Sequence, residues 1–308
     1  MNDSNRHFPL PPRGFVLAVA ALILCFALPL YRLARFALHS DLSSYILLVP
    51  VISLGMVWLK RPFPPPPSSP NRKLAVLLLA AGAAAPAAFG LSVFFGMRWP
   101  SPDSLAVASL SFSLLLAGLC AWFLGRRTVR AIAFPLAFLV FMAPLPVSLA
   151  NSLETFLQHT SAAVAYLFFD GTGMPVLRRG ALGFQLPGMN LQVAPQCSGL
   201  HSSLALFIVS LPAGYLFLRS PWKRAALSAA VIPVGIVRNG FRIFTIGELC
   251  VRIGPQMIDS YLHRTGGWIF FLLALGPFFI LLFLLMQAER PAAHGEAKPG
   301  DQTFKDMI

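Results

Sequence analysis

Long apolar segments recur along the chain, and they restrict its possible folds more than any other feature. A helix needs about 20 apolar residues to cross a bilayer. The chain has 308 residues, 56% of them hydrophobic and only 11% charged, with a mean hydropathy of +0.71. These values predict an all-α, polytopic helical membrane protein with about eight transmembrane helices. The expected spans are residues 14–31, 42–59, 74–95, 104–124, 130–147, 200–218, 225–247 and 267–287.

A further apolar stretch, residues 152–169, differs from the others because it has a polar side. Glu154, Gln158 and His159 recur there at helical spacing. We interpret the stretch as a short amphipathic helix that lies at, or dips into, the extracytoplasmic membrane surface. Glycine and proline punctuate residues 177–194, which predict a small hairpin next to it.

Basic residues set the predicted orientation. Lys and Arg gather in the segments 60–73, 126–130 and 219–224, and such residues accumulate on the cytoplasmic side of a membrane. With these loops inside, residues 152–169 cannot be a complete span, and both termini are cytoplasmic. The net charge of +13 then reflects juxtamembrane loops, so nucleic acid is not an expected partner.

The same reasoning gives the predicted domain organisation. Residues 1–288 are expected to form one multi-pass domain in the cytoplasmic (inner) membrane, with membrane lipid around it. The polar residues 289–308 are expected to form a disordered cytoplasmic tail.

A polar island around Cys197 interrupts the apolar pattern just before residues 200–218. The first turn of a helix favours a thiolate, because unpaired amides and the helix dipole stabilise negative charge there. The alternative is a structural thiol, or a disulfide with Cys250. The four cysteines lack metal-ligand spacing, so we expect neither a metal nor a cofactor.

Two arginines lie inside the predicted span 225–247. Arg238 and Arg242 are four residues apart and share one helical face. An arginine in a membrane segment is costly and is a candidate functional residue. The alternative is that these side chains snorkel to the interface or pair with Glu248.

Two histidines are candidate proton carriers for the thiol. His263 precedes the last span, and His201 lies one helical turn after Cys197. A thiolate, a cation that stabilises negative charge and an imidazole are the groups that acyl transfer through a thioester needs. All three would lie on the extracytoplasmic face.

Three motifs in the second half of the chain resemble those of the exosortase and archaeosortase family. They are Gln-Cys-Ser-Gly-Leu at residues 196–200, Asn-Gly-Phe-Arg-Ile at 239–243, and His263 ahead of a glycine and an aromatic residue. The resemblance implies catalytic motifs within residues 190–268 of a membrane-embedded cysteine transpeptidase. Cys197 is similar in position to the nucleophile, Arg242 to the arginine and His263 to the histidine. Arg238 remains the alternate arginine and His201 the alternate base.

The resemblance also implies a class of substrate. Such enzymes act on proteins with a C-terminal sorting signal, in bacteria usually of the PEP-CTERM type: a Pro-Glu-Pro motif, a transmembrane helix and a basic tail. The acyl group would pass to a cell-surface acceptor. Two alternatives remain, namely a membrane cysteine protease that transfers the acyl group to water and a non-enzymatic transporter or assembly component of exopolysaccharide export. One departure is His201, which stands where the family commonly has arginine.

Overall fold

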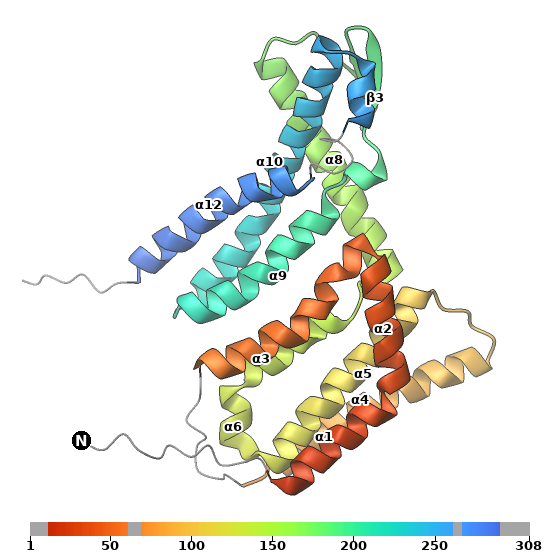
Figure 1. Ribbon diagram of the computed structural model, residues 1–308, viewed down its shortest axis with the longest axis vertical. Coiled ribbons are helices and arrows are strands. Elements are labelled where there is room, and N and C mark those ends of the chain that lie inside the picture. The colour runs from red at the N-terminus through yellow and green to blue at the C-terminus, as the bar shows by residue number, and fades with distance from the viewer. Residues whose placement is uncertain (1–11, 61–68, 261–266, 290–308) are drawn as a thin grey trace, which may run out of the picture.

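The structure is a computed structural model, and it describes residues 12–60, 69–260 and 267–289. Most of these residues are helical (Figure 1). Six helices are long and apolar enough to cross a membrane, and eight are counted if each of two bent pairs is taken as one span. The prediction of an all-α polytopic membrane protein is therefore confirmed.

The first half of the chain forms one group of helices around a shared core. The core joins Leu33 and Ala37 with Tyr45, Phe112 and Phe138, and the helix α9 (Leu200–Phe217) of the second half also contributes to it. The elements are α1 (Arg13–Cys25), α2 (Ala27–His39), η1 (Asp41–Leu47), α3 (Leu48–Lys60), α4 (Arg72–Phe94), α5 (Ser101–Phe123), α6 (Gly125–Ala131), α7 (Ala133–Phe138) and η2 (Leu139–Met142).

The second half places a small sheet at one end of a group of long helices (Figure 1). Its elements are α8 (Val147–Gly171), β1 (Leu177–Arg179), β2 (Gly183–Leu186), β3 (Met189–Gln192), η3 (Pro195–Cys197), α9 (Leu200–Phe217), α10 (Pro221–Arg252), η4 (Pro255–Asp259) and α12 (Gly267–Gln287). The sheet is an antiparallel meander in the order β1-β2-β3, so the predicted hairpin has a third strand. Its inner face packs Phe184, Leu186 and Leu191 against Phe169 of α8.

The predicted fifth span, residues 130–147, is wrong as a single helix. The chain there is divided among the end of α6, α7 and η2, and it turns by 88° into α8. Pro144 and Pro146 lie in this break, and proline disfavours helical backbone in the residue before it. The first predicted span is also broken, because α1 and α2 meet at 63°.

The helix predicted over residues 152–169 is longer than expected. It runs from Val147 to Gly171, which is 25 residues, so the description as short is wrong. One of its three polar residues has a different role, because Gln158 is buried and donates a hydrogen bond of 2.7 Å to the Val193 carbonyl, whereas His159 is exposed as expected. The Gln158 side chain binds the protein rather than the membrane surface.

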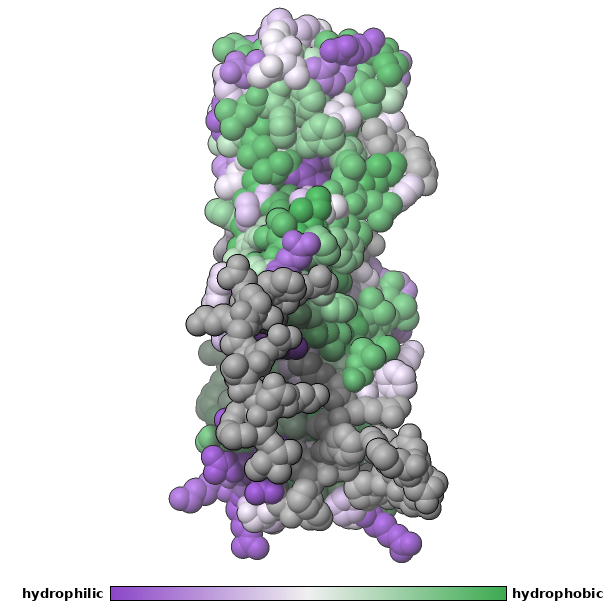
Figure 2. Space-filling view, turned by 90° about the vertical axis from the view of Figure 1, so that its left-hand side faces the viewer, coloured by the Kyte–Doolittle hydropathy of each residue, from purple (hydrophilic) through white to green (hydrophobic). Residues whose placement is uncertain are grey.

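Apolar side chains cover much of the outside of the helices. Leu54, Phe94 and Leu284 are among the large hydrophobic residues that are exposed. Figure 2 shows hydrophobic residues over much of the upper part of the visible face and down its right-hand side, and hydrophilic residues gathered at the top and bottom ends. This distribution suits a protein whose middle is surrounded by lipid.

The end of α12 is tied to the turn between α9 and α10. The Glu289 carboxylate accepts hydrogen bonds from the backbone N–H groups of Arg219, at 2.7 Å, and Ser220, at 2.8 Å. These bonds lower the pKa of Glu289, because they stabilise the charged carboxylate. Glu289 is thus bonded to the helical domain, although it was assigned to the tail; the other tail residues lie outside the described residues.

Candidate active site

Cys197 lies in the connection between the sheet and the membrane helix α9. The chain leaves β3 at Gln192, forms the short helix η3 that ends at Cys197, and enters α9 at Leu200. The Cys197 N–H donates to the Ala194 carbonyl at 2.8 Å. The thiol is half-buried. Cys197 therefore precedes the helix, whereas the sequence predicted it within the first turn.

Gly199 allows this connection to pass close to α10. Its φ is +76°, and residues other than glycine rarely adopt this backbone conformation. A Cβ atom at this position would lie 2.7 Å from Asn239 Cγ and 2.9 Å from Arg238 Nη2. Both its backbone conformation and its surroundings thus require glycine.

Two neighbouring side chains of α10 hold the connection by its carbonyl groups. Asn239 Nδ2 donates to the Cys197 carbonyl at 2.7 Å, and Arg238 Nη2 donates to the Gly199 carbonyl at 3.3 Å. Asn239 is only 1% exposed, so its hydrogen bond is shielded from water and strengthened by the low local dielectric. The chain is therefore anchored at the nucleophile candidate and again two residues after it.

The same two residues also carry unused hydrogen-bonding capacity. Arg238 Nε and Asn239 Oδ1 are buried and have no hydrogen-bond partner among the described residues. A buried polar atom without a partner costs about 1–3 kcal/mol, so such atoms often mark a functional site. Arg238 also lines an apolar cavity of about 500 Å³ between α8, α10 and α12, together with Phe168, Phe241 and Leu273.

Arg242, one helical turn beyond Arg238, acts on the thiol through its charge. Burial raises the pKa of Cys197, and the positive charge of Arg242 lowers it without cancelling the effect of burial. A hydrogen bond with the Ala194 backbone lowers the pKa further, but the net change is still upward. The direction of this pKa change is thus opposite to the one expected from the helix dipole.

Glu248 does not neutralise either arginine within the described residues. It binds Arg252 instead, with Arg252 Nε 2.6 Å from the carboxylate. The alternative in which Arg238 or Arg242 pairs with Glu248 is therefore wrong. Arg238 contacts the backbone beside Cys197, while Arg242 provides the charge that the thiol experiences.

A third anchor comes from α8, and the sequence did not identify it as part of the site. The hydrogen bond from Gln158 to the Val193 carbonyl fixes the chain four residues before Cys197. The signal for it was present, because Gln158 is one of the polar residues that recur at helical spacing on α8. The structure assigns the polarity of Gln158 to the support of the cysteine loop.

Of the two candidate histidines, the structure describes only His201. His201 lies in the first turn of α9 with its side chain exposed, and no hydrogen bond joins it to Cys197 in the part of the chain that the structure describes. His263 lies outside the described residues. The assignment of the base to His263 therefore stays a prediction.

The disulfide alternative is wrong in this structure. None of the four cysteines, all of them in the described part of the chain, forms a disulfide, and Cys250 is buried within α10. Cys197 thus has two features that a nucleophile needs, a thiol that is not oxidised and a nearby cation.

The comparisons with known proteins agree with the motifs. The family model of the transmembrane exosortases matches residues 37–280, so the match extends well beyond the second half of the chain. It includes Cys197, Asn239, Arg242 and His263. No curated protein and no solved structure matches. Because the matched range is more than half of its length, the chain belongs to the transmembrane exosortase family.

Proposed function

We propose that this membrane sorting transpeptidase works through a thioester on Cys197. The observation that carries the proposal is the position of Cys197, a half-buried thiol outside any disulfide, anchored to α10 by Asn239 and subject to the charge of Arg242. A cysteine used only for packing needs neither a nearby cation nor a loop held through its carbonyl groups. The substrates are proteins with a C-terminal sorting signal of a Pro-Glu-Pro motif, an apolar helix and a basic tail.

The first half of the reaction forms the thioester. The raised pKa of Cys197 means that its proton has to be removed as the sulfur attacks, and His263 takes this proton. The sulfur bonds to a backbone carbonyl carbon of the substrate, and Arg242 stabilises the resulting oxyanion. The carbon–nitrogen bond then breaks, and the leaving amine receives its proton from His263.

The second half passes the acyl group to an acceptor. An amine of a cell-surface component attacks the thioester carbonyl, and the Cys197 sulfur leaves as a thiolate. The proton released by the attacking amine returns to the thiolate through His263. If water attacks instead, the protein is a cysteine protease with the same first half.

Substitution of the nucleophile tests the proposal. A secreted reporter carrying such a sorting signal is expressed with the enzyme, and its processing is measured at matched membrane abundance. Cys197→Ala and Cys197→Ser are expected to abolish processing, whereas Cys250→Ala, a buried thiol elsewhere, retains it. Normal processing by Cys197→Ser would instead indicate a transporter or assembly component, in which the thiol is incidental.

The products decide between transfer and hydrolysis. Transpeptidation leaves the reporter joined to an acceptor, and this adds mass to its new C-terminus. Hydrolysis leaves a free carboxylate there. We expect the joined product, to be detected by mass spectrometry of the processed reporter.

The side of the membrane on which the chemistry takes place is part of the proposal. We propose that Cys197 faces the extracytoplasmic side of the inner membrane and that both termini are cytoplasmic. A topology reporter fused after Lys73 or Arg224 is then cytoplasmic, and one inserted at Gly188 is extracytoplasmic. A cytoplasmic signal at Gly188 would contradict this mechanism.

A further inference from the structure

Strand β3 leads directly to Cys197 and forms one edge of the sheet. The strand order is β1-β2-β3, so β2 pairs with β3 on one side only. Gln192, its last residue, is five positions before Cys197. A peptide lying along the open edge of β3 would therefore run beside the chain that carries the nucleophile.

The hydrogen-bonding pattern shows which groups face that open edge. The Val193 N–H donates to the Leu182 carbonyl at 2.9 Å, so Val193 and Leu191 direct their main-chain groups toward β2. In an antiparallel ladder the alternate residues face the other way. Asn190 and Gln192 consequently direct two N–H and two C=O groups away from the sheet.

No main-chain pairing occupies this edge in the described part of the chain. Among the described elements only β2 makes extensive contact with β3, and no described residue bonds the outward main-chain groups of Asn190 and Gln192. Unpaired edge groups readily pair with another extended chain. The edge is thus available to an incoming strand.

The two edges of the sheet differ in the protection they carry. The β1 edge has Arg178 and Arg179, and charged side chains are a usual means of preventing strand addition. The β3 edge has only the neutral amides of Asn190 and Gln192. This asymmetry favours strand addition at β3, the edge that is continuous with Cys197.

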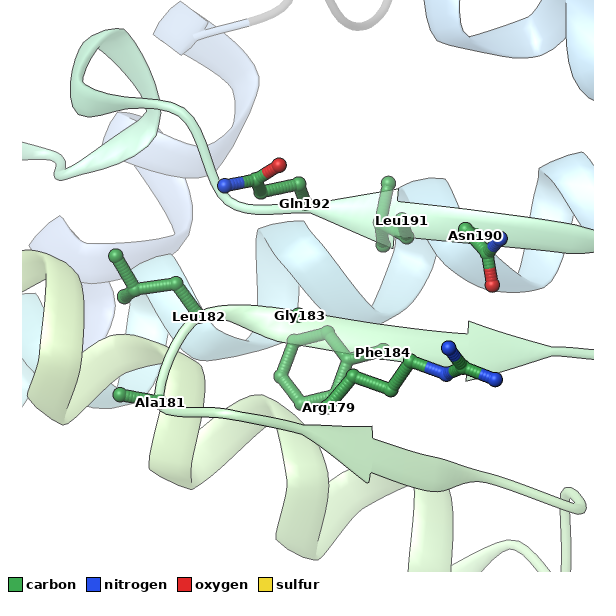
Figure 3. Close-up of a pocket in the computed structure, with 8 residues that line it drawn as sticks. All are labelled: Arg179, Ala181, Leu182, Gly183, Phe184, Asn190, Leu191 and Gln192. Carbon is green, nitrogen blue, oxygen red and sulfur yellow. The ribbon is translucent and has the colours of Figure 1, made fainter.

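The outer face of the sheet has space next to this edge. A cavity of about 500 Å³ is bordered by Arg179, Gly183, Asn190 and Gln192, and Figure 3 shows their positions on the three strands. Arg179, Gly183 and Gln192 are cross-strand neighbours. Gly183 adds no side chain to the border of this cavity, and Asn190 and Gln192 border it on the β3 side.

We propose that the protein substrate binds as a fourth strand along β3, with the residues before its scissile bond running toward Cys197. This proposal rests on the proposed function and adds where and in which conformation the substrate binds. The direction of the bound peptide follows from the position of Cys197 between the sheet and membrane helix α9. The part of the substrate after the scissile bond is an apolar helix and belongs on the membrane side, so the part before the bond lies on the side of the sheet. The added strand is therefore parallel to β3.

Binding of this kind uses the main chain of the substrate for affinity. The outward groups of Asn190 and Gln192 can form up to four hydrogen bonds with an extended peptide that has no proline at the paired positions. Only alternate side chains of the peptide lie on the outer face of the sheet. The enzyme would consequently tolerate varied residues upstream of the Pro-Glu-Pro motif and select for an extended segment there.

Proline at an outward position tests the proposal. Gln192→Pro removes an N–H that faces the open edge but leaves the β2–β3 ladder intact, because Leu191 and Val193 form that ladder. Gln192→Ala is the matched comparison, since it removes the side chain and keeps the N–H. We expect processing of the sorting-signal reporter to fall about tenfold or more for Gln192→Pro, and by a smaller factor for Gln192→Ala.

The reactivity of Cys197 toward a small, membrane-impermeant thiol reagent reports whether the variants are folded. An unchanged reactivity in Gln192→Pro combined with lost processing supports strand addition. Equal processing by the proline and alanine variants would overturn the proposal. If both variants lost processing equally while Cys197 kept its reactivity, the side chain of Gln192 and not its N–H would be responsible.

Cross-linking keeps the proposal testable if Gln192→Pro does not fold. Asn190→Cys is placed in the Cys197→Ala background, and single cysteines are placed in the reporter at successive positions before the scissile bond. We expect disulfides at every second position, because alternate residues of a strand share one face. Cross-links without this period of two, or no cross-links, would overturn the proposal.

The two proposals fail in different ways. If Cys197→Ala still processes the reporter, the thioester mechanism is wrong. If Cys197→Ala is inactive while Gln192→Pro processes normally, only the binding of substrate along β3 is wrong.

Discussion

The Asn239 side chain donates a hydrogen bond of 2.7 Å to the carbonyl oxygen of Cys197. Asn239 lies in the interior of a 32-residue helix and is buried, so the position of the cysteine depends on how α10 packs. This bond links the asparagine of one motif to the cysteine of another, 42 residues apart in sequence. The asparagine thus acts as a positioning residue for the proposed nucleophile.

Removal of this hydrogen bond is expected to reduce processing by a factor of ten or more. Asn239→Ala leaves the Cys197 carbonyl without its buried donor, which costs about 1–3 kcal/mol, and frees the loop to move. Asn239→Asp keeps the shape but lacks the donor, so it should fail as well. Thr245→Ala is the control, because Thr245 bonds only within α10. Processing at matched abundance is the measurement, and near-normal processing by Asn239→Ala would contradict the anchoring role.

Gly199 and Gly188 offer a matched pair of alanine substitutions. Both glycines have positive φ, +76° and +78°, so each alanine introduces a similar backbone strain, of about 1–2 kcal/mol. Only at Gly199 would the new Cβ collide with Asn239 and Arg238; nothing lies within 4 Å at Gly188. We expect Gly199→Ala to lose at least tenfold in processing and Gly188→Ala to lose less than threefold. Equal losses would mean that strain alone is responsible.

The pH dependence of Cys197 alkylation tests the effect of Arg242. The thiolate is the reactive form, and burial raises the pKa of Cys197, so the rate should still be rising above the pH at which an ordinary thiol has ionised. Arg242→Gln removes the cation that lowers this pKa, and the rate profile should shift to higher pH. Arg252→Gln, on the same helix but exposed, should leave the profile unchanged.

Arg242→Lys separates the charge of Arg242 from its shape. The alkylation profile should remain close to that of the unmodified protein, because the positive charge is retained. Processing should nevertheless fall, since lysine lacks the planar guanidinium that can direct donors at an oxyanion. Full processing by Arg242→Lys would reduce the role of Arg242 to that of a simple charge.

The histidine substitutions distinguish the two candidate bases. Removal of a general acid or base costs about 10²- to 10⁴-fold in turnover, and we expect this loss for His263→Ala. His201→Ala should cost less, because the His201 side chain is exposed on α9. Turnover of the sorting-signal reporter is the measurement. An inactive His201→Ala variant together with an active His263→Ala variant would transfer the role of base to His201.

Two features of the fold lay beyond what hydropathy can predict. The hydropathy of residues 152–169 records that Gln158 is polar, but not which group its side chain binds. In the structure Gln158 is buried and binds the Val193 carbonyl inside the protein. The span predicted over residues 130–147 ignored the local backbone restrictions of Pro144 and Pro146, which separate η2 from α8.

The sequence by itself determined the membrane class and the candidate residues Cys197, Arg238 and Arg242. In a bilayer, apolar length is nearly sufficient to identify a span, and a charged or reactive group in such a setting stands out. Tertiary structure alone decided how the two arginines differ: Arg238 binds the Gly199 carbonyl, and Arg242 acts on the thiol. The reason is that these contacts join segments about 40 residues apart, and their geometry depends on the packing of α10 against the cysteine loop, which local periodicity does not encode.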